Sequence, residues 1–315
     1  MKNKAQPNST RQVIPPAPGK LVAVGGARMH AIVKGTGTAT VILESGAGGS
    51  VLEWSMVAEA LSAEATVVTR DRPGFAWSDY VKRDRSAVAA AQDMRELLQA
   101  LGKPGPYVLV GHSLGGLHVL AYAMMFPKEV AGVVLVDSAH DRAYEGQWVL
   151  RSMLQVMRGL ILLRPILGKR FVRDTYFRML TSGQAMPTQM EPILALFSIM
   201  DEANGPWFKG MYDEFGSVIQ SAHQVTELRR LAAFPRVPVR IISQGLGLKA
   251  SSPHKAMFER LVALHAELCC LSPNSQHHIA EQSGHMVQLD QPSLVVDTIL
   301  EVLRQPPPRE QANFM

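Results

Sequence analysis

The 315-residue sequence contains little cysteine and no dense run of charge of one sign. Its two cysteines, Cys269 and Cys270, are adjacent, and adjacent residues seldom meet disulfide geometry because their Cβ atoms diverge. We therefore expect no disulfide framework. The 32 basic residues exceed the 27 acidic ones without forming blocks of Lys and Arg, so nucleic acid is not an expected partner.

Several sequence signals are also missing. The first twenty residues begin with basic residues but contain no apolar run, so they predict neither a signal peptide nor a membrane anchor, and we expect a cytoplasmic protein. No metal-ligand spacing, Walker loop or dinucleotide fingerprint occurs. We therefore expect no metal and no cofactor.

Short apolar runs alternate with helical periodicity over much of the chain. Runs at 40–45, 66–71, 107–112 and 133–138 predict strands, and the segments 53–62, 86–102 and 114–126 predict helices. This alternation indicates a mostly parallel sheet flanked by helices, and its Val-rich and Ile-rich strands indicate burial on both faces. An opening hairpin is expected around Gly25 and Gly26. The strands' carboxyl ends should carry the functional site.

The sequence predicts one α/β core interrupted by a helical insertion. Strand and helix signals stop near Ala139 and resume at 237–243, a gap far longer than the roughly 12–15 residues that an unstructured loop reaches. The predicted parts are a flexible tail at 1–18, a core at 19–138 and 236–304, a helical cap at 139–235 and a second tail at 305–315. The cap is inserted after the sixth strand.

The segment YVLVGHSLGGLHVL places Ser113 at a junction between a strand and a helix. Gly111 and Gly115 flank Ser113 at two residues on either side, and small residues there permit a strained turn and close approach of strand and helix. Serine needs a base to become a strong nucleophile. We interpret Ser113 as a candidate nucleophile, and a glycine-rich turn with an idle serine is the structural alternative.

A serine nucleophile needs two N–H donors for the oxyanion that forms when it attacks a carbonyl. The backbone N–H of Leu114, next after Ser113, is the first candidate. The second should come from the turn ESGAGGS at 44–50, which follows the third strand. We assign it to Ala47, with Gly48 as the alternative.

The base is predicted from position, since ten histidines are present. His285 follows the last predicted strand on a loop preceded by Gly284, which places it on the same rim as Ser113. His112 and His118 flank the nucleophile but are expected to point elsewhere. The pair at 277–278 lies at the start of its strand, the wrong end.

A carboxylate must orient the histidine and stabilise its charged form. The run QGLGLKASSP after the strand at 237–243 contains no Asp or Glu, whereas the strand before the cap ends in VVLVDSAH. Asp137 in this run is therefore the predicted acid. Glu281, a carboxylate of the cap or a Ser–His dyad are the alternatives.

The motifs GHSLGG, DRPGFAWSD, VLVDSAH and SGHMVQLDQP together resemble the α/β-hydrolase superfamily over nearly the whole chain. Most members carry the acid after the next-to-last strand, and this sequence departs from that pattern. Asp137 matches the place used in several haloalkane dehalogenases. Those enzymes and the epoxide hydrolases attack with an aspartate, however, whereas a serine suits acyl transfer.

The resulting expectation is a carboxylesterase acting on uncharged, small to medium acyl substrates. Amidase, lactonase and perhydrolase activity use the same residues, and an aminopeptidase would need cap carboxylates such as Asp201, Glu202 or Glu214. A ligand-binding receptor of low turnover is the alternative from another class. The basic segment at 150–180 could touch an anionic membrane surface, but a basic outer face over an apolar inner one is the preferred interpretation.

Overall fold

The computed structural model describes residues 14–143, 148–180, 188–202, 206–249 and 255–305. Eight strands form one sheet in the order β1-β2-β4-β3-β5-β6-β7-β8. Their bounds are β1 (Lys20–Val24), β2 (Ala27–Lys34), β3 (Thr40–Glu44), β4 (Thr66–Arg70), β5 (Tyr107–His112), β6 (Val130–Val136), β7 (Val239–Gln244) and β8 (Ser275–Ala280). The predicted hairpin is confirmed, since β1 pairs antiparallel with β2. Apart from β2, which is also antiparallel to β4, the remaining pairs are parallel.

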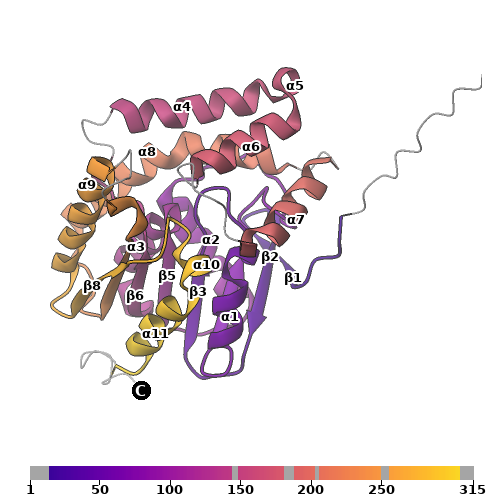
Figure 1. Cartoon of the computed structure of the whole chain (residues 1–315). Helices are drawn as coiled ribbons and strands as arrows, with labels where there is room; N and C mark the ends of the chain where they lie inside the picture. Colours follow the sequence, from indigo (N-terminus) through magenta and orange to yellow (C-terminus); the bar gives the residue numbers. More distant parts are fainter. Residues whose placement is uncertain (1–13, 144–147, 181–187, 203–205, 250–254, 306–315) are drawn as a thin grey trace, which may run out of the picture.

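Helices cover both faces of the sheet (Figure 1). The core helices are α1 (Ser55–Leu61), α2 (Ala87–Ala100), α3 (Leu114–Met125), α9 (Lys255–Glu267), α10 (Val287–Asp290) and α11 (Pro292–Leu303). Alternate strand residues pack into two apolar cores, because successive side chains of a strand point to opposite faces. Ile42 and Leu109 join the core with α2 and α3, whereas Val41 and Val108 join the core with α1 and α11.

Five helices follow β6 and precede β7 in the chain. They are α4 (Trp148–Leu162), α5 (Arg164–Leu167), α6 (Lys169–Leu180), α7 (Glu191–Glu202) and α8 (Trp207–Leu231). Together they form a cap across one end of the sheet (Figure 1). The predicted α/β-hydrolase fold with a helical cap after the sixth strand is thus confirmed. Within the described residues, no helix combines the length and the apolarity that crossing a bilayer requires.

Candidate active site

Ser113 occupies a strained turn between β5 and α3. Its φ of 50° and ψ of −122° lie where residues other than glycine are seldom found. A Cβ atom on Gly111 would lie 2.5 Å from the carbonyl oxygen of Gly115, so glycine permits the close approach of strand and helix. The Ser113 carbonyl accepts the N–H of Ala139 at 2.8 Å. This turn holds Ser113 half-buried at the carboxyl end of the sheet.

His285 and Asp137 are brought together from different strand ends. Asp137 directly follows β6, and its Oδ2 atom lies 2.6 Å from Nδ1 of His285 on the loop after β8. Burial alone would raise the pKa of the Asp137 carboxyl, but hydrogen bonds from His285 and from the Gln244 backbone outweigh it and keep this pKa below its usual value. The ionised carboxylate can only accept, so Nδ1 of His285 donates and its Nε2 atom is left to take a proton.

Gln244 occupies the end of β7, where most family members are expected to carry the acid. Its backbone N–H donates to Oδ1 of Asp137 at 3.0 Å, and its side-chain amide donates to Oδ2 at 2.8 Å. Gln244 therefore holds the carboxylate of Asp137, which follows the neighbouring strand β6, by hydrogen bonds. Glu281, the alternative acid, is an exposed residue of the turn after β8.

His112 differs from expectation, because it does not point away from the site. Its ring lies 4.6 Å from the ring of His285, and its Nε2 donates to the His285 carbonyl oxygen at 2.9 Å. Burial, and secondarily the proximity of His285, lowers the pKa of His112 to about 3. His112 is thus a neutral donor that holds the His285 backbone. His118 does point elsewhere, with Nδ1 2.9 Å from Oε1 of Glu44.

The glycine-rich loop after β3 lies against Ser113. A Cβ atom on Gly46 would be 3.1 Å from the Cβ of Ser113, so this loop packs directly on the candidate nucleophile. The N–H of Gly48 donates to Oε2 of Glu214 at 2.7 Å. Glu214 thus takes the N–H of Gly48, the alternative second oxyanion donor, and Ala47 stays the predicted one. The first candidate donor, Leu114, is the first residue of α3.

Two residues of cap helix α8 hold this loop. Besides the Glu214 contact, Nε1 of Trp207 donates to the carbonyl oxygen of Gly48 at 2.9 Å. Both polar backbone groups of Gly48 are thus bonded to side chains of the cap. From the sequence, Glu214 was a candidate only for binding a substrate amine. No local motif indicated that it contacts a loop residue 166 positions away.

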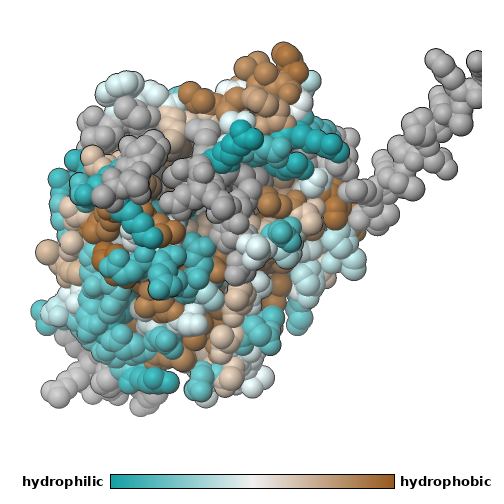
Figure 2. Space-filling model, in the orientation of Figure 1, coloured by the Kyte–Doolittle hydropathy of each residue, from teal (hydrophilic) through white to brown (hydrophobic). Residues whose placement is uncertain are grey.

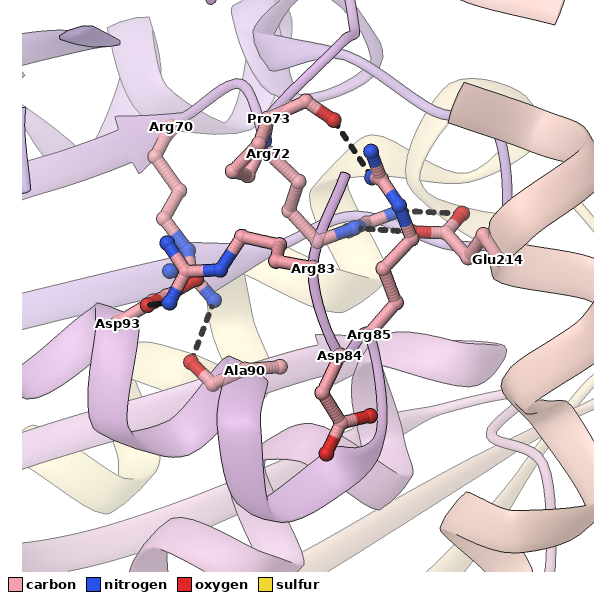
Figure 3. Close-up of a pocket in the computed structure, with 9 residues that line it drawn as sticks. All are labelled: Arg70, Arg72, Pro73, Arg83, Asp84, Arg85, Ala90, Asp93 and Glu214. Atoms are coloured by element: carbon pink, nitrogen blue, oxygen red, sulfur yellow. Dashed lines mark hydrogen bonds and ion pairs between the residues drawn. The ribbon is translucent and has the colours of Figure 1, made fainter. Parts of the chain in front are cut away.

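Glu214 belongs to a buried network of charges beneath the loop. Its two carboxylate oxygens accept from Nε and Nη2 of Arg72 at 2.7 and 3.0 Å (Figure 3). Arg72 also donates to Oε1 of Glu44 and to the carbonyl oxygens of Ser45 and Gly46. Burial would raise the pKa of Glu214, but Arg72 outweighs it and lowers this pKa. The network fixes the loop from below through charge-assisted hydrogen bonds.

A small charged cavity lies beside this network (Figure 3). It is lined by Arg70, Arg72, Pro73, Arg83, Asp84, Arg85, Ala90, Asp93 and Glu214. Its volume of about 20 Å³ is room for about one water molecule. The cavity is therefore too small for an ester substrate.

The remaining predictions concern cap carboxylates and metals. The side chains of Asp201 and Glu202 lie outside what the structure describes. Glu214 is paired with Arg72, so its charge is already compensated. Among the described side chains, no three His, Cys, Asp or Glu residues gather as a metal site would require.

Comparison with known proteins agrees with this architecture. The sequence model of the alpha/beta hydrolase fold family matches residues 39–159. An uncharacterized protein of Bacillus subtilis, YbdG, is 26% identical over 55% of this chain and 54% of its own length. The matched region therefore spans about half of that relative. An uncharacterized protein of Mycobacterium tuberculosis is 27% identical over 92% of this chain and 82% of its own.

Among solved structures, the enol-lactonase from Burkholderia xenovorans has the same fold. The two superpose with a TM-score of 0.65 at 19% identity, and the match covers 90% of this chain and 98% of the lactonase. At this identity the likeness concerns the fold. With its eight-stranded sheet, its cap after β6 and the family match over β3 to α4, the chain has the α/β-hydrolase fold.

Proposed function

We propose that the chain is a serine hydrolase that cleaves carboxylic esters of uncharged, small to medium acyl substrates through an acyl-enzyme on Ser113. The observation that carries the proposal is the 2.6 Å contact between Asp137 and His285, on the sheet rim where Ser113 occupies its strained turn. A carboxylate after β6, an imidazole after β8 and a serine after β5 are the parts that nucleophilic acyl transfer needs.

In the proposed reaction, Nε2 of His285 takes the Ser113 proton while Oγ bonds to the ester carbon. The carbonyl oxygen becomes an oxyanion, which the backbone N–H groups of Ala47 and Leu114 stabilise. The intermediate collapses to the acyl-enzyme, and the imidazolium protonates the departing alcohol. Water then attacks in the same way and releases the acid and Ser113. Asp137 stabilises the imidazolium at both stages.

Two structural features bear on the alternatives. An aminopeptidase needs a carboxylate for the substrate amine, and the Glu214 carboxylate is already paired with Arg72. A receptor of low turnover was considered because no acid follows β7. The ionised Asp137 beside His285 removes that reason, and it supports an enzyme over a receptor.

A fluorophosphonate probe separates an enzyme from a receptor, because only an activated serine reacts readily. We expect rapid stoichiometric labelling of the wild type, located at Ser113 by peptide mass spectrometry, and none of Ser113→Ala. Ser152→Ala, which removes an exposed serine of α4, is the matched control and should label normally. Failure of the wild type to label would favour the receptor.

Turnover of matched substrates then tests the reaction class. Short and medium acyl esters should be hydrolysed by the wild type, and Ser113→Ala should lose this activity. Amide and lactone substrates of the same acyl size define the preference among acyl compounds. Equal ester turnover by the wild type and Ser113→Ala would refute the proposal.

A further inference from the structure

The outer tip of the cap exposes a cluster of large apolar side chains. Leu162, Leu163, Ile166, Leu167 and Phe171 are 62%, 48%, 81%, 40% and 55% exposed. They come from the end of α4, from the residue that joins it to α5, from α5 and from the start of α6, and we call them the apolar tip. Figure 2 shows apolar surface gathered at this part of the molecule. Five exposed large apolar residues within ten positions are unusual for a surface that faces water alone.

The apolar tip differs from the expected basic outer face over an apolar inner one. The inner face exists, since Leu154, Met157 and Ile161 of α4 and Val172 of α6 are buried. However, the exposed residues of the apolar tip are apolar as well, although they do not take part in this inner face. The exposed side chains are therefore additional to those that hold the cap on the core.

Basic residues surround the apolar tip. Residues 150–180 contain seven Lys and Arg against one acid, Asp174, and Figure 2 shows a hydrophilic band over α6 beside the apolar surface. Arg158 and Arg164 stack on Tyr212 and Phe208 of α8, so part of this charge also holds the cap together. Arg151, Arg170 and Arg178 are exposed. The apolar tip thus belongs to a segment rich in basic residues, and the exposed Arg170 lies next to Phe171 in the chain.

The presence of basic side chains beside the apolar ones indicates the chemical class of the partner. A second copy of the chain in a two-fold dimer would place the same patch against itself, and the exposed basic side chains of the two copies, Arg170 among them, would repel one another. An anionic lipid surface offers the opposite charge together with an apolar layer behind it. We propose that the apolar tip inserts into the interface of membranes that contain anionic lipids.

In this arrangement the side chains of Leu162, Ile166 and Phe171 enter the boundary between headgroups and acyl chains. The surrounding Arg and Lys side chains reach the level of the lipid phosphates, because their long apolar stems allow the charged ends to stay in water. Contact through the cap tip does not involve Ser113 or His285. The proposal therefore stands apart from the catalytic one.

Flotation of the full chain with lipid vesicles tests the proposal. The wild type should bind vesicles of phosphatidylcholine with phosphatidylglycerol more strongly than vesicles of phosphatidylcholine alone, and salt should weaken the binding. Ile166→Asp with Phe171→Asp should lower the vesicle partition coefficient by about tenfold or more, from the loss of buried apolar surface. Both positions are exposed, and an unchanged thermal unfolding curve will show that the fold is intact.

Leu231→Asp is the matched control. Leu231 is 72% exposed and ends α8, whereas Arg164 beside the tip stacks on Phe208 near the start of α8. With a rise of about 1.5 Å per residue, the two ends of α8 are about 35 Å apart, so this variant should bind like the wild type. Ser113→Ala should also bind like the wild type, which separates this surface from the catalytic proposal.

Arg170→Glu tests the charge. It should weaken binding to anionic vesicles and leave binding to neutral vesicles unchanged. Equal binding of the wild type and the doubly substituted tip variant would overturn the proposal, as would a wild type that binds neither vesicle. Sedimentation in the ultracentrifuge tests whether a second copy of the chain binds the tip instead. A wild-type dimer that Ile166→Asp dissociates would make the tip a face for self-association, and this result would also overturn the membrane proposal.

Discussion

Oδ2 of Asp137 lies 2.6 Å from Nδ1 of His285, although 148 positions separate the two residues. Asp137 follows β6 and His285 follows β8, so β7 lies between the strands that deliver them. The side chain of Gln244, at the end of β7, completes the arrangement by donating to the same Asp137 oxygen. The acid therefore reaches the histidine across an intervening strand whose own terminal residue is neutral.

Asp137→Asn should lower kcat by about 10³–10⁴-fold, because an amide cannot stabilise the imidazolium and favours the wrong tautomer of His285. Steady-state kinetics with an ester substrate measure the change. Asp79→Asn is the control, since Asp79 pairs with Arg28 at the surface and should retain normal kcat. If Asp137→Asn kept more than about a tenth of the rate, the acid would have to lie elsewhere or the site would be a dyad.

Gly111→Ala should destabilise the fold by about 3 kcal/mol, because the new methyl group meets the Gly115 backbone and overpacks the turn at Ser113. Gly159→Ala in α4 should stabilise it by about 0.5–1 kcal/mol, since no described atom beyond its own helix turn lies within 4 Å of the added Cβ and alanine suits a helix better. Urea unfolding of both variants measures these opposite signs. A Gly111→Ala protein as stable as the wild type would contradict the close approach of strand and helix.

Glu214→Gln should lower kcat by about ten- to a hundredfold with little change in KM, because the loop that carries Ala47 loses its charged anchor. Arg72 also loses a buried partner, so we expect a loss of stability on the order of 3–5 kcal/mol. Glu227→Gln alters an exposed pair with Arg230 on the same helix and should change neither quantity. A Glu214→Gln enzyme with normal kcat would show that the loop keeps its shape without the cap.

Glu53, in the turn between the glycine-rich loop and α1, gives the protein a specific dependence on pH. Its side chain is buried, and within the described part of the chain its Oε2 atom accepts no hydrogen bond. Burial raises the pKa of Glu53 from 4.5 to about 8, and nearby Glu214 and Asp71 add to the effect. The folded protein therefore keeps a proton that the unfolded chain releases, and the free energy of unfolding falls as pH rises from about 4.5 to 8.

Glu53→Gln removes this titration while keeping an oxygen acceptor of similar size. The variant should gain stability over the wild type by up to a few kcal/mol, with the difference growing from pH 5 to pH 8 and levelling above about pH 8. Urea unfolding at a series of pH values measures it. Glu96→Gln, at an exposed position of α2, should show no such trend. A constant difference for Glu53→Gln would mean that Glu53 is ionised in the folded protein.

The sequence was sufficient to predict the fold because the strands that form its centre consist mostly of apolar residues. β3, β5 and β6 were recognisable for this reason, and the glycines around Ser113 marked the turn between strand and helix. The absence of Asp and Glu after β7 directed attention to Asp137, whose carboxylate contacts His285. These signals are local, so they appear in the linear order of residues.

Contacts between distant segments carried no such signal. The pairing of Glu214 with Arg72 and Gly48 depends on how α8 crosses the sheet, and a helical pattern alone does not give that crossing. The position of His112 against His285 likewise depends on a loop conformation. The exposure of Ile166 and Phe171 could not be predicted, because an amphipathic pattern does not show what remains uncovered after the inner face has packed.

The two bonds that bind α8 to Gly48 also constrain how a substrate can reach Ser113. Swinging α8 outward would remove the Glu214 and Trp207 side chains from the loop and would leave the Arg72 guanidinium short of a counterion. We therefore expect α8 to serve as a stationary wall throughout turnover. Substrate and product must then pass beside α8, and any opening motion must belong to the cap helices that precede α8 in the chain.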